Sequence, residues 1–399
     1  MKKELKIEKI YIGGWFQRTM LHLTEIYDFL REGKSQLEGL DKNKLNDLRD
    51  SLDIKDINFA IDGFEYIELN TNSGINVSID EDGLIVLSSA VTSKESLTSE
   101  INELEEFYEN KFSPAISYIF SLGAPVPKEL ANIQTVYPYF VVLNDATNDE
   151  IMELLSQNDK QRYFSYENES LNIVRGDKYY FINTKNKKAS EKVQMYIEEQ
   201  IFIREFKGQL HRYLNLHRIL WEKIDSIKER TKVKGKDILE FSSKIEEYAK
   251  TINLIDARIN QMGTYLRTRE KIAKSDTDFK IFTNIMEYKY ETLGDTLAYI
   301  KQIWGMTKNY VNSAKSLFSD LSGEITKKSV DNLTIVTSMG VGASLIGLFG
   351  ETSFPTITTF GVIYFFGLAL VGYCVGKFME YVGAKRNYEI ADQEYEEIK

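Results

Sequence analysis

The stretch from Gly13 to His22 carries the residue types best suited to bind a small anionic ligand. Gly13-Gly14 follows a short apolar run and predicts a turn between a strand and a helix N-terminus, where free N–H groups attract phosphate. Trp15 could stack on a base, Arg18 could pair with phosphate, and His22 lies one helical turn beyond Arg18. The alternative interpretation is a turn followed by an ordinary packed helix.

Arg162, Tyr163 and Arg175 form a second candidate for ligand binding. No pattern in the chain predicts catalysis, because it has no P-loop, no Cys/His nucleophile pair and no zinc-ligand spacing. Acidic pairs such as Glu105-Glu106 are expected on solvated helix faces. We therefore expect a binding protein and not an enzyme.

The cysteine, histidine and charge content excludes several classes of site. The single cysteine, Cys374, lies in an apolar run, so neither an intrachain disulfide nor a thiolate metal site can form. His211 and His217 are six residues apart, whereas ligands aligned on one helix face are four apart. The net charge of −10 argues against direct nucleic-acid binding. No tightly bound cofactor is expected, and the identity of any metal stays unknown.

The length of 399 residues allows two or three domains. With 28 % charged and 43 % hydrophobic residues, most of the chain is expected to be soluble, with a membrane part confined to one end. The N-terminus opens Met-Lys-Lys-Glu without an apolar core behind it, so no signal peptide is predicted.

A single long helix is predicted from Phe279 to Gly350, because apolar residues recur three and four positions apart over most of it. At 1.5 Å per residue this helix would be roughly 108 Å long, too long for one globular core. The spacing is typical of a coiled-coil seam, and we expect this first seam to pack against neighbouring subunits. The first seam consists of Met286, Tyr290, Leu293, Leu297, Ile300, Trp304, Thr307, Val311, Ala314, Phe318, Leu321 and Ile325.

A second series with the same spacing, from Thr296 to Leu348, is more polar and turns acidic toward its end. This second seam could line a central channel if the first seam contacts neighbours, and its acidic rings would then concentrate cations. The alternative is a solvated face of the stalk. The predicted pore-lining residues are Asp320, Glu324, Asp331, Thr334, Ser338, Val341, Leu345, Leu348, Phe349 and Glu351.

Two apolar runs, Leu333–Gly350 and Phe360–Gly376, predict a pair of membrane spans. The first would be roughly 27 Å of helix, just sufficient to cross a bilayer. The short link Glu351–Thr359 forces the two spans to be antiparallel. Basic residues flank the pair, and the link has none, so both termini are predicted to be cytosolic in a multi-pass protein of the inner membrane. The alternative is a buried apolar hairpin in a soluble protein. The flanking basic residues are Lys327, Lys328, Lys377, Lys385 and Arg386.

The remaining pattern predicts an α+β cytosolic domain, then long coiled-coil helices and a two-helix transmembrane domain. Between Pro138 and Pro355 there is no proline, which favours uninterrupted helices over Ala189–Thr231 and Asp237–Lys274 joined as a hairpin. The expected strands are Lys6–Ile12, Phe64–Leu69, Gly74–Ile79, Leu84–Ser88, Tyr139–Leu143, Tyr163–Tyr166, Ser170–Val174 and Lys178–Ile182. Shorter helices are expected over Trp15–Arg31, Ser96–Phe120 and Asp149–Ser156. The expected segments are 1–188 (α/β domain), 189–275 (hairpin), 276–332 (stalk), 333–350 (first span), 351–359 (outer loop), 360–378 (second span) and 379–399 (cytosolic tail).

This order of elements resembles the CorA family of divalent-cation channels over the whole chain. Residue by residue the match is confined to the outer loop, where Gly347 corresponds to the glycine of the Gly-Met-Asn motif and Glu351 and Pro355 fall near the expected acidic residue and proline. The resemblance implies a homo-oligomer, a pentamer, in a lipid bilayer. Leu348 and Phe349 depart from the motif, and phenylalanine cannot hold a hydrated ion, which argues against selective Mg²⁺ uptake.

The chain is most similar to a divergent branch, the CorA-like membrane effectors associated with type III CRISPR systems. Those proteins keep the two spans and lack the usual motif, and the stretch Gly13–Leu23 resembles that branch. The resemblance implies an antiviral effector gated by a small nucleotide second messenger, SAM-AMP in the best-known case. The bound species it implies are this nucleotide ligand and divalent cations. Two alternatives remain: a constitutive divalent-cation channel or transporter, and a membrane-anchored scaffold that does not conduct.

Overall fold

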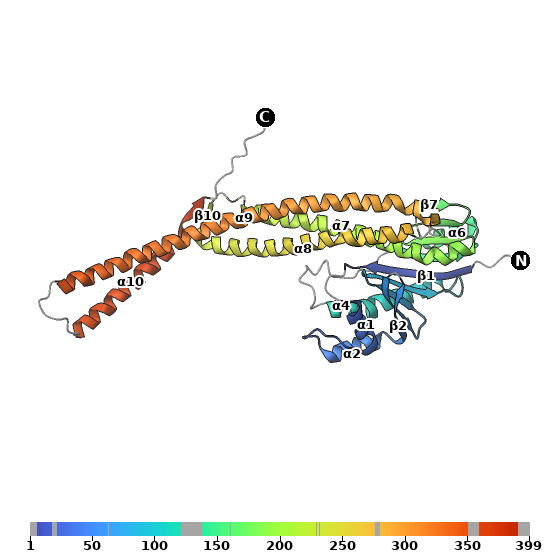
Figure 1. The fold of residues 1–399 in the computed structure, drawn as a ribbon, viewed down its shortest axis with the longest axis horizontal. Coiled ribbons are helices and arrows are strands. Elements are labelled where there is room, and N and C mark those ends of the chain that lie inside the picture. Colours follow the sequence, from blue (N-terminus) through green and yellow to red (C-terminus); the bar gives the residue numbers. More distant parts are fainter. Residues whose placement is uncertain are drawn as a thin grey trace, which may run out of the picture. The chain divides into compact units, whose positions relative to one another are not determined.

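The computed structural model describes residues 6–17, 22–62, 64–120, 138–159, 161–228, 230, 232–275, 280–349 and 359–389 (Figure 1). The chain divides into two compact units. Unit 1 comprises residues 1–214 and 254–302, and unit 2 comprises residues 215–253 and 303–399. Three long helices pass from one unit into the other.

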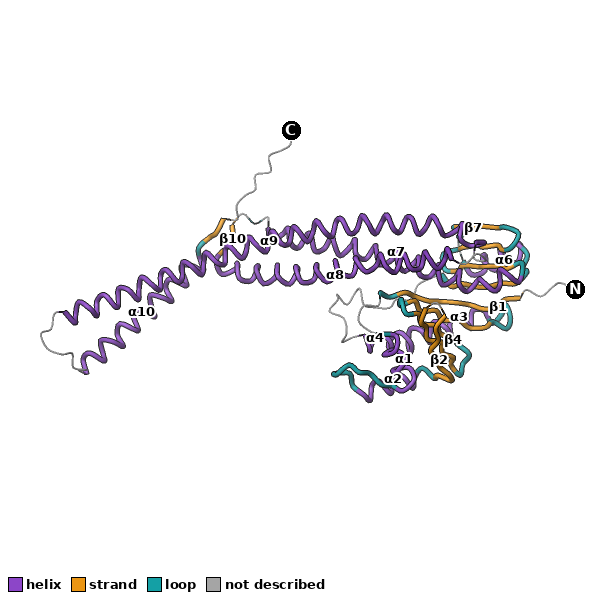
Figure 2. Tube along the Cα trace, viewed as in Figure 1, coloured by secondary structure: helices purple, strands orange, loops and turns teal. Residues whose placement is uncertain are grey.

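Unit 1 contains a nine-stranded sheet in the order β2-β3-β4-β5-β1-β6-β9-β8-β7 (Figure 2). Neighbouring strands are antiparallel except β6 and β9, which are parallel. The strands are β1 (Lys6–Trp15), β2 (Ile54–Asp62), β3 (Phe64–Thr71), β4 (Asn76–Asp80), β5 (Leu84–Ala90), β6 (Tyr139–Asn144), β7 (Phe164–Glu167), β8 (Leu171–Arg175) and β9 (Tyr179–Thr184). The predicted meander of β3, β4 and β5 is confirmed, whereas β2 was not predicted.

Short helices complete unit 1 and bury their apolar faces against this sheet in one core. Asp41 caps α2 through its carboxylate, and Thr147 with Glu150 forms a capping box at the start of α6. Pro114 lies at the start of α4, directly after a π-helical turn that interrupts the predicted helix Ser96–Phe120. The helices are α1 (Leu23–Glu32), α2 (Lys42–Ser51), α3 (Leu97–Phe107), η1 (Tyr108–Phe112), α4 (Ser113–Phe120) and α6 (Asn148–Asn158).

The dipeptide Gly13-Gly14 lies within a strand, which corrects the predicted turn. Gly13 and Gly14 pair with Val86 and Ile85 of β5, and β1 continues to Trp15. A Cβ on Gly13 would come within 2.4 Å of the Ile85 carbonyl oxygen and 2.9 Å of the Ile201 side chain. Glycine is therefore required here because the backbone of β5 and the Ile201 side chain of α7 leave no room for a Cβ.

Three helices of exceptional length follow the sheet: α7 (Lys187–Lys228), α8 (Gly235–Ser275) and α9 (Lys280–Phe349). The predicted hairpin and the single long stalk helix are confirmed. Within unit 1 they contact one another through pairs such as Tyr196 and Phe282, whose rings stack at 4.6 Å.

The first seam packs inside one chain, which corrects the expectation that it faces other subunits. Ten of its positions, from Met286 to Phe318, are buried without any second copy present. Trp304 is fully buried and meets the edge of the His217 ring, while Phe318 contacts Phe241 of α8. The apolar spacing therefore reports intrachain packing of α9 on α7 and α8.

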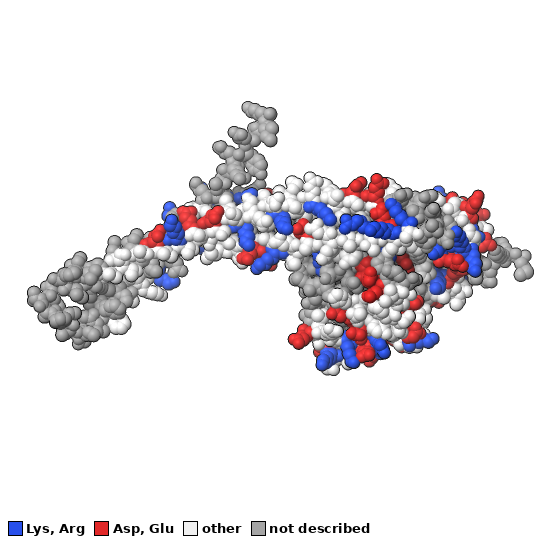
Figure 3. Space-filling view, viewed as in Figure 1, with Lys and Arg blue, Asp and Glu red and all other residues white. Residues whose placement is uncertain are grey.

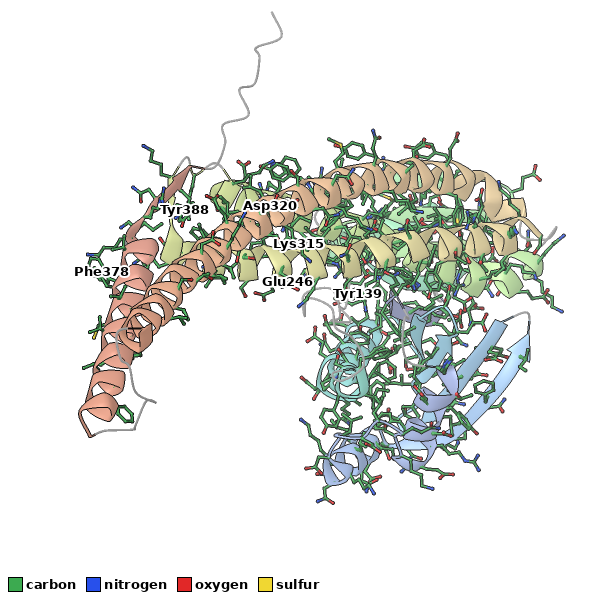
Figure 4. The ribbon with its side chains drawn as sticks, turned by 60° about the vertical axis from the view of Figure 1, so that its left-hand side comes forward. Tyr139, Glu246, Lys315, Asp320, Phe378 and Tyr388 are labelled. Carbon is green, nitrogen blue, oxygen red and sulfur yellow. The ribbon has the colours of Figure 1, made fainter. Side chains whose placement is uncertain are left out.

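Unit 2 ends in a helix and a strand that return to the turn between α7 and α8. Helix α10 (Thr359–Lys385) is followed by β11 (Asn387–Glu389), which pairs antiparallel with β10 (Lys232–Lys234). The Gly235 N–H donates to the Arg386 carbonyl oxygen at 3.0 Å, and Tyr388 is buried beside this turn (Figure 4). This two-stranded closure was not predicted from the sequence.

The predicted spans 333–350 and 360–378 fall on the end of α9 and on α10. Within the described ranges, no helix is both long enough and apolar enough to cross a membrane. The apolar side chains of α10 that are described are exposed, among them Phe366, Leu370 and Phe378.

Candidate ligand-binding site

A cavity of about 390 Å³ in unit 1 has the composition of an anion-binding site. It lies between strands β6, β8 and β9 and helices α7 and α9, and its volume is within the range of about 300–1,000 Å³ typical of small-molecule pockets. We call it the basic pocket. Its lining residues are Pro138, Phe140, Arg175, Tyr180, Gln200, Ile203, Arg204, Lys207, Leu210, His211, Tyr288, Lys289, Thr292, Leu293 and Thr296.

Four cationic side chains line the basic pocket: Arg175, Arg204, Lys207 and Lys289. None of the described lining residues is Asp or Glu. Burial, together with repulsion from Arg175 and Lys207, lowers the pKa of Lys289 to about 8. The pocket therefore holds a concentration of positive charge that would favour an anionic ligand.

Arg204 is fixed in place by two contacts that leave one of its nitrogens unused. Its Nη2 donates to the Gly13 carbonyl oxygen at 2.7 Å, and its Nε pairs with Glu205 at 3.1 Å. Its buried Nη1 has no hydrogen-bond partner among the described residues. The glycine that allows α7 to approach β1 thus also provides the carbonyl that orients this guanidinium.

Gln200 contributes a second unused donor. Its Oε1 accepts a 2.6 Å hydrogen bond from the Nζ of Lys289, which joins α7 to α9. Its Nε2 is buried and finds no partner in the described part of the chain. An unpaired buried donor costs about 1–3 kcal/mol, so ligand oxygens that accept from Gln200 and Arg204 would gain that amount.

Aromatic rings adjoin the cations. Phe140 and Tyr180, from the parallel strands β6 and β9, are buried with ring centroids 5.1 Å apart. Tyr288 lies on α9, one residue before Lys289, and the residue is 71 % exposed. An exposed ring beside a cationic pocket can stack on a planar group of a ligand.

Helical spacing brings the lining side chains together. Ile203, Lys207 and Leu210 recur at four and three residues along α7, so they share one face. Tyr288 and Thr292 are likewise four residues apart on α9. Because α7 and α9 lie far apart in the sequence, no local motif marks the pocket.

A buried ionic network lies elsewhere in unit 1, around Arg269 of α8. Its guanidinium pairs with Asp82 at 2.5 Å, with Asp80 at 2.7 Å and with Glu199 at 3.4 Å. Tyr290 of α9 donates a short hydrogen bond to Glu199. The network therefore ties the β4–β5 turn to all three long helices.

Carboxylates outnumber cations in this network, and several of these carboxyl groups have a raised pKa. Burial raises the pKa of Asp80 and of Glu199, although Arg269 opposes the shift of both. Burial, with repulsion from Asp80, raises the pKa of the nearby Glu198 to about 7. Among the described residues, no group of three or more His, Cys, Asp or Glu is arranged to hold a metal ion. The network is therefore interpreted as a structural tie.

The ligand site predicted at Trp15, Arg18 and His22 is not the basic pocket. Trp15 is only 4 % exposed; it packs against Phe202 and its indole N–H donates to the Asp82 carbonyl oxygen. This position in the core corrects the expectation that Trp15 stacks on a ligand. His22 is exposed at the N-terminus of α1, and Arg18 lies outside the described residues.

The structure separates the three residues of the second predicted ligand site. Arg175 lines the basic pocket, whereas Arg162 and Tyr163 are exposed and do not belong to its lining. Arg204, Lys207 and Lys289 were missed, because charged residues on a helix are expected at ordinary exposed positions.

The predicted pore-lining residues that the structure describes are all exposed in the single chain. They are Asp320, Glu324, Asp331, Thr334, Ser338 and Val341, and Figure 4 labels Asp320 on α9. The side chains of Leu345, Leu348 and Phe349, and the whole of Glu351, lie outside the described residues.

On the face drawn in Figure 3, Lys and Arg side chains follow one another along the long helices.

No protein-family model and no curated protein sequence matches the chain. Among solved structures, the CorA magnesium transporter from Methanocaldococcus jannaschii matches with a TM-score of 0.27 and 11 % sequence identity. The match covers 63 % of this chain and 94 % of the transporter. A TM-score of this size is too low to support a conclusion about fold or function.

Proposed function

We propose that the protein is a homo-oligomeric membrane channel that opens when a nucleotide-type ligand occupies the basic pocket. The observation that carries the proposal is the continuity of α9 from Lys280 to Phe349. The helix bears Tyr288 and Lys289 of the pocket near one end and the uncharged run Leu333–Phe349 at the other. A ligand bound at the first end can therefore act on the second through one continuous helix.

Membrane attachment is supported by sequence and by surface. The runs Leu333–Gly350 and Phe360–Gly376 lack charged side chains, and basic residues flank them. The exposed apolar side chains of α10, such as Phe366 and Leu370, would be satisfied in lipid. The pairing of β10 with β11 agrees with an antiparallel pair of spans whose ends return to one side.

Self-association is assigned to the second seam, because α7 and α8 of the same chain already cover the first. The second seam is exposed at Met306, where 57 % of the residue is accessible, and at Asp320, Glu324 and Asp331. Acidic rings formed by these residues in an oligomer would favour cations over anions.

Gating follows from differential binding. A ligand that neutralises the cations of the basic pocket stabilises whichever arrangement of α7 and α9 presents them best. The coupling cannot exceed the difference in affinity between closed and open states, so a tenfold preference corresponds to about 1.4 kcal/mol per site. The proposed messenger is SAM-AMP-like, and the proposed setting is antiviral defence, on the strength of the resemblance to CRISPR-associated CorA-like effectors.

Flux through liposomes tests the proposal. Purified full-length protein is reconstituted, and cation flux is recorded with and without an added nucleotide. Flux that requires the nucleotide supports the channel proposal. Flux that needs only a gradient favours a constitutive divalent-cation channel. The acidic residues of the second seam support that alternative. Absence of flux under both conditions favours a scaffold.

The gate is proposed at Leu345, Leu348 and Phe349, because rings of apolar side chains close narrow pores by expelling water. We expect Leu345→Ser and Leu348→Ser to conduct without ligand and to be toxic on expression, since a hydroxyl keeps the constriction wet. Phe349→Asn is expected to shift selectivity toward divalent cations. If both serine variants stay as silent as the wild type without nucleotide, the constriction lies elsewhere.

A further inference from the structure

We infer that the basic pocket binds a nucleotide in two adjoining subsites, a phosphate subsite at Arg175, Arg204, Lys207 and Lys289 and a ring subsite at Tyr288. The inference rests on the proposed function and names the residues that would recognise its ligand. It moves the site away from Gly13–His22, where the sequence alone had placed it.

The phosphate subsite is carried by converging charge. Arg175 is near enough to both Lys289 and Arg204 for its charge to lower the pKa of each, although burial is the larger cause in both cases. These cations come from three elements, β8, α7 and α9, and no carboxylate is among the described lining residues. A phosphate group would relieve the repulsion and could accept several charge-assisted hydrogen bonds.

Unused donors provide independent support. The Nε2 of Gln200, a residue only 6 % exposed, and the Nη1 of Arg204 are both buried without partners in the described chain. Both side chains line the pocket, and their other polar atoms are already fixed by Lys289, Gly13 and Glu205. The donors are thus held in place before any ligand binds, which lowers the entropic cost of binding.

The ring subsite follows from the position of Tyr288. Tyr288 is exposed, lines the basic pocket and adjoins Lys289 on the same helix. Stacking of a base on such a ring typically strengthens binding by about 5- to 100-fold, which corresponds to roughly 1–3 kcal/mol. A ligand with phosphate but no ring would lose this increment.

Binding should also take up protons. A bound phosphate stabilises the charged form of Lys289, so above about pH 8, where part of this lysine is neutral, binding adds a proton to it. Calorimetry in two buffers of different ionisation enthalpy at pH 8.5 measures that uptake, which we expect to be a fraction of one proton per site and to vanish in Lys289→Gln.

The decisive experiment is calorimetry on the full-length protein in detergent, with AMP, pyrophosphate and adenosine as probes. We expect AMP to bind, adenosine to bind at least tenfold more weakly, and Arg175→Gln/Lys207→Gln to weaken AMP binding at least tenfold. Both replaced side chains belong to exposed residues, so this variant is expected to fold, which circular dichroism checks. Lys315→Gln, which removes an exposed cation farther along α9, is the matched control and should bind as the wild type does (Figure 4).

Tyr288 variants test the ring subsite. Tyr288→Ala should weaken AMP binding about fivefold or more and leave pyrophosphate binding unchanged, whereas Tyr288→Phe should retain both. Equal affinity for adenosine and AMP, unchanged binding in the double variant, or loss of binding only in Arg18→Ala would overturn the site. Failure of the wild type to bind AMP or pyrophosphate at millimolar concentration would overturn it as well.

The outcomes separate this inference from the channel proposal. Binding that follows the expected pattern, without nucleotide-dependent flux, sustains the site and refutes the channel. Nucleotide-dependent flux that persists unchanged in Arg175→Gln/Lys207→Gln refutes the site and leaves the channel standing.

Discussion

Lys289 of α9 donates a 2.6 Å hydrogen bond to Gln200 of α7, across the boundary between the two helices that wall the basic pocket. The lysine is held there although burial and two neighbouring cations disfavour its charge. A ligand site commonly carries such a cost, because groups arranged to meet a ligand are unfavourable without it.

Burial of the charged Lys289 side chain should destabilise the folded protein in a pH-dependent way. Its pKa is about 8 in the folded chain and near 10.5 when unfolded, so the unfolded state binds more protons between these values and stability rises with pH across that window. We compare the free energy of unfolding of Lys289→Met with that of the wild type. The variant's value, relative to the wild type, should be higher at pH 7 than at pH 10 by about 1–3 kcal/mol. A difference that does not change with pH would contradict the buried charge.

Glu198 should destabilise the folded protein at alkaline pH. Its pKa is raised from 4.5 to about 7, so its contribution to stability is fully present below about pH 4.5 and is lost as the pH rises through 7. Glu198→Gln mimics the protonated acid; it should match the wild type near pH 5 and exceed it by about 1–3 kcal/mol at pH 8. Denaturant unfolding at the two pH values measures this. Exposed Glu191→Gln on the same helix serves as control, and an equal gain at both pH values would contradict the assignment.

Trp304 is expected to stabilise the fold of the single chain. It is fully buried against α7, so Trp304→Asp should lower the free energy of unfolding by about 3–5 kcal/mol, through lost packing and a buried charge. Thermal unfolding followed by circular dichroism reports the loss, and Tyr299→Ala, at a residue 57 % exposed, should change stability by less than about 1 kcal/mol. A Trp304→Asp protein that unfolds like the wild type but no longer associates would instead place this residue between subunits.

Gly13 and Gly208 offer a matched pair on β1 and α7. Gly13→Ala should destabilise by about 1–3 kcal/mol, because its Cβ would meet the Ile85 carbonyl oxygen and Ile201. Gly208→Ala should stabilise by roughly 0.5–1 kcal/mol, because nothing lies within 4 Å of the added Cβ and alanine favours helix. Chemical denaturation of both variants tests the contrast. Equal effects would show that the Ile85 carbonyl oxygen and Ile201 do not lie as close to Gly13 as described.

Elements with a strong local period were predictable from the sequence. The run from Met286 to Phe318 specifies an apolar helix face by itself, and the turn residues around Gly74 and Gly83 delimit the strands of the meander. The spacing of the apolar residues does not specify which helices pack against that face. The same face serves an intrachain bundle or an oligomer, and here α7 and α8 occupy it.

The errors at the candidate site come from contacts remote in sequence. The sequence predicts a turn at Gly13-Gly14, but Gly13 lies in a strand where the Ile85 carbonyl oxygen and the Ile201 side chain exclude a Cβ, and no local pattern reveals these contacts. Trp15 was interpreted as a stacking surface, but the aromatic residues of α7 cover it. The sequence singles out Arg175 but neither Arg204 nor Lys289, and only the fold places the three together at the basic pocket.

The pairing of β10 with β11 also sets an order of events during synthesis. Lys232–Lys234 leaves the ribosome long before Asn387–Glu389, so the turn between α7 and α8 must wait with an unpaired edge while α9 and α10 are made. Closing so long a loop has an entropic cost that local helix formation does not carry, and its strands have only three residues each to offset it. We therefore expect this closure to follow the formation of the long helices. A chain that ends before Tyr388 would keep its long helices but lack the pairing of β10 with β11, which connects the end of α10 to the turn between α7 and α8.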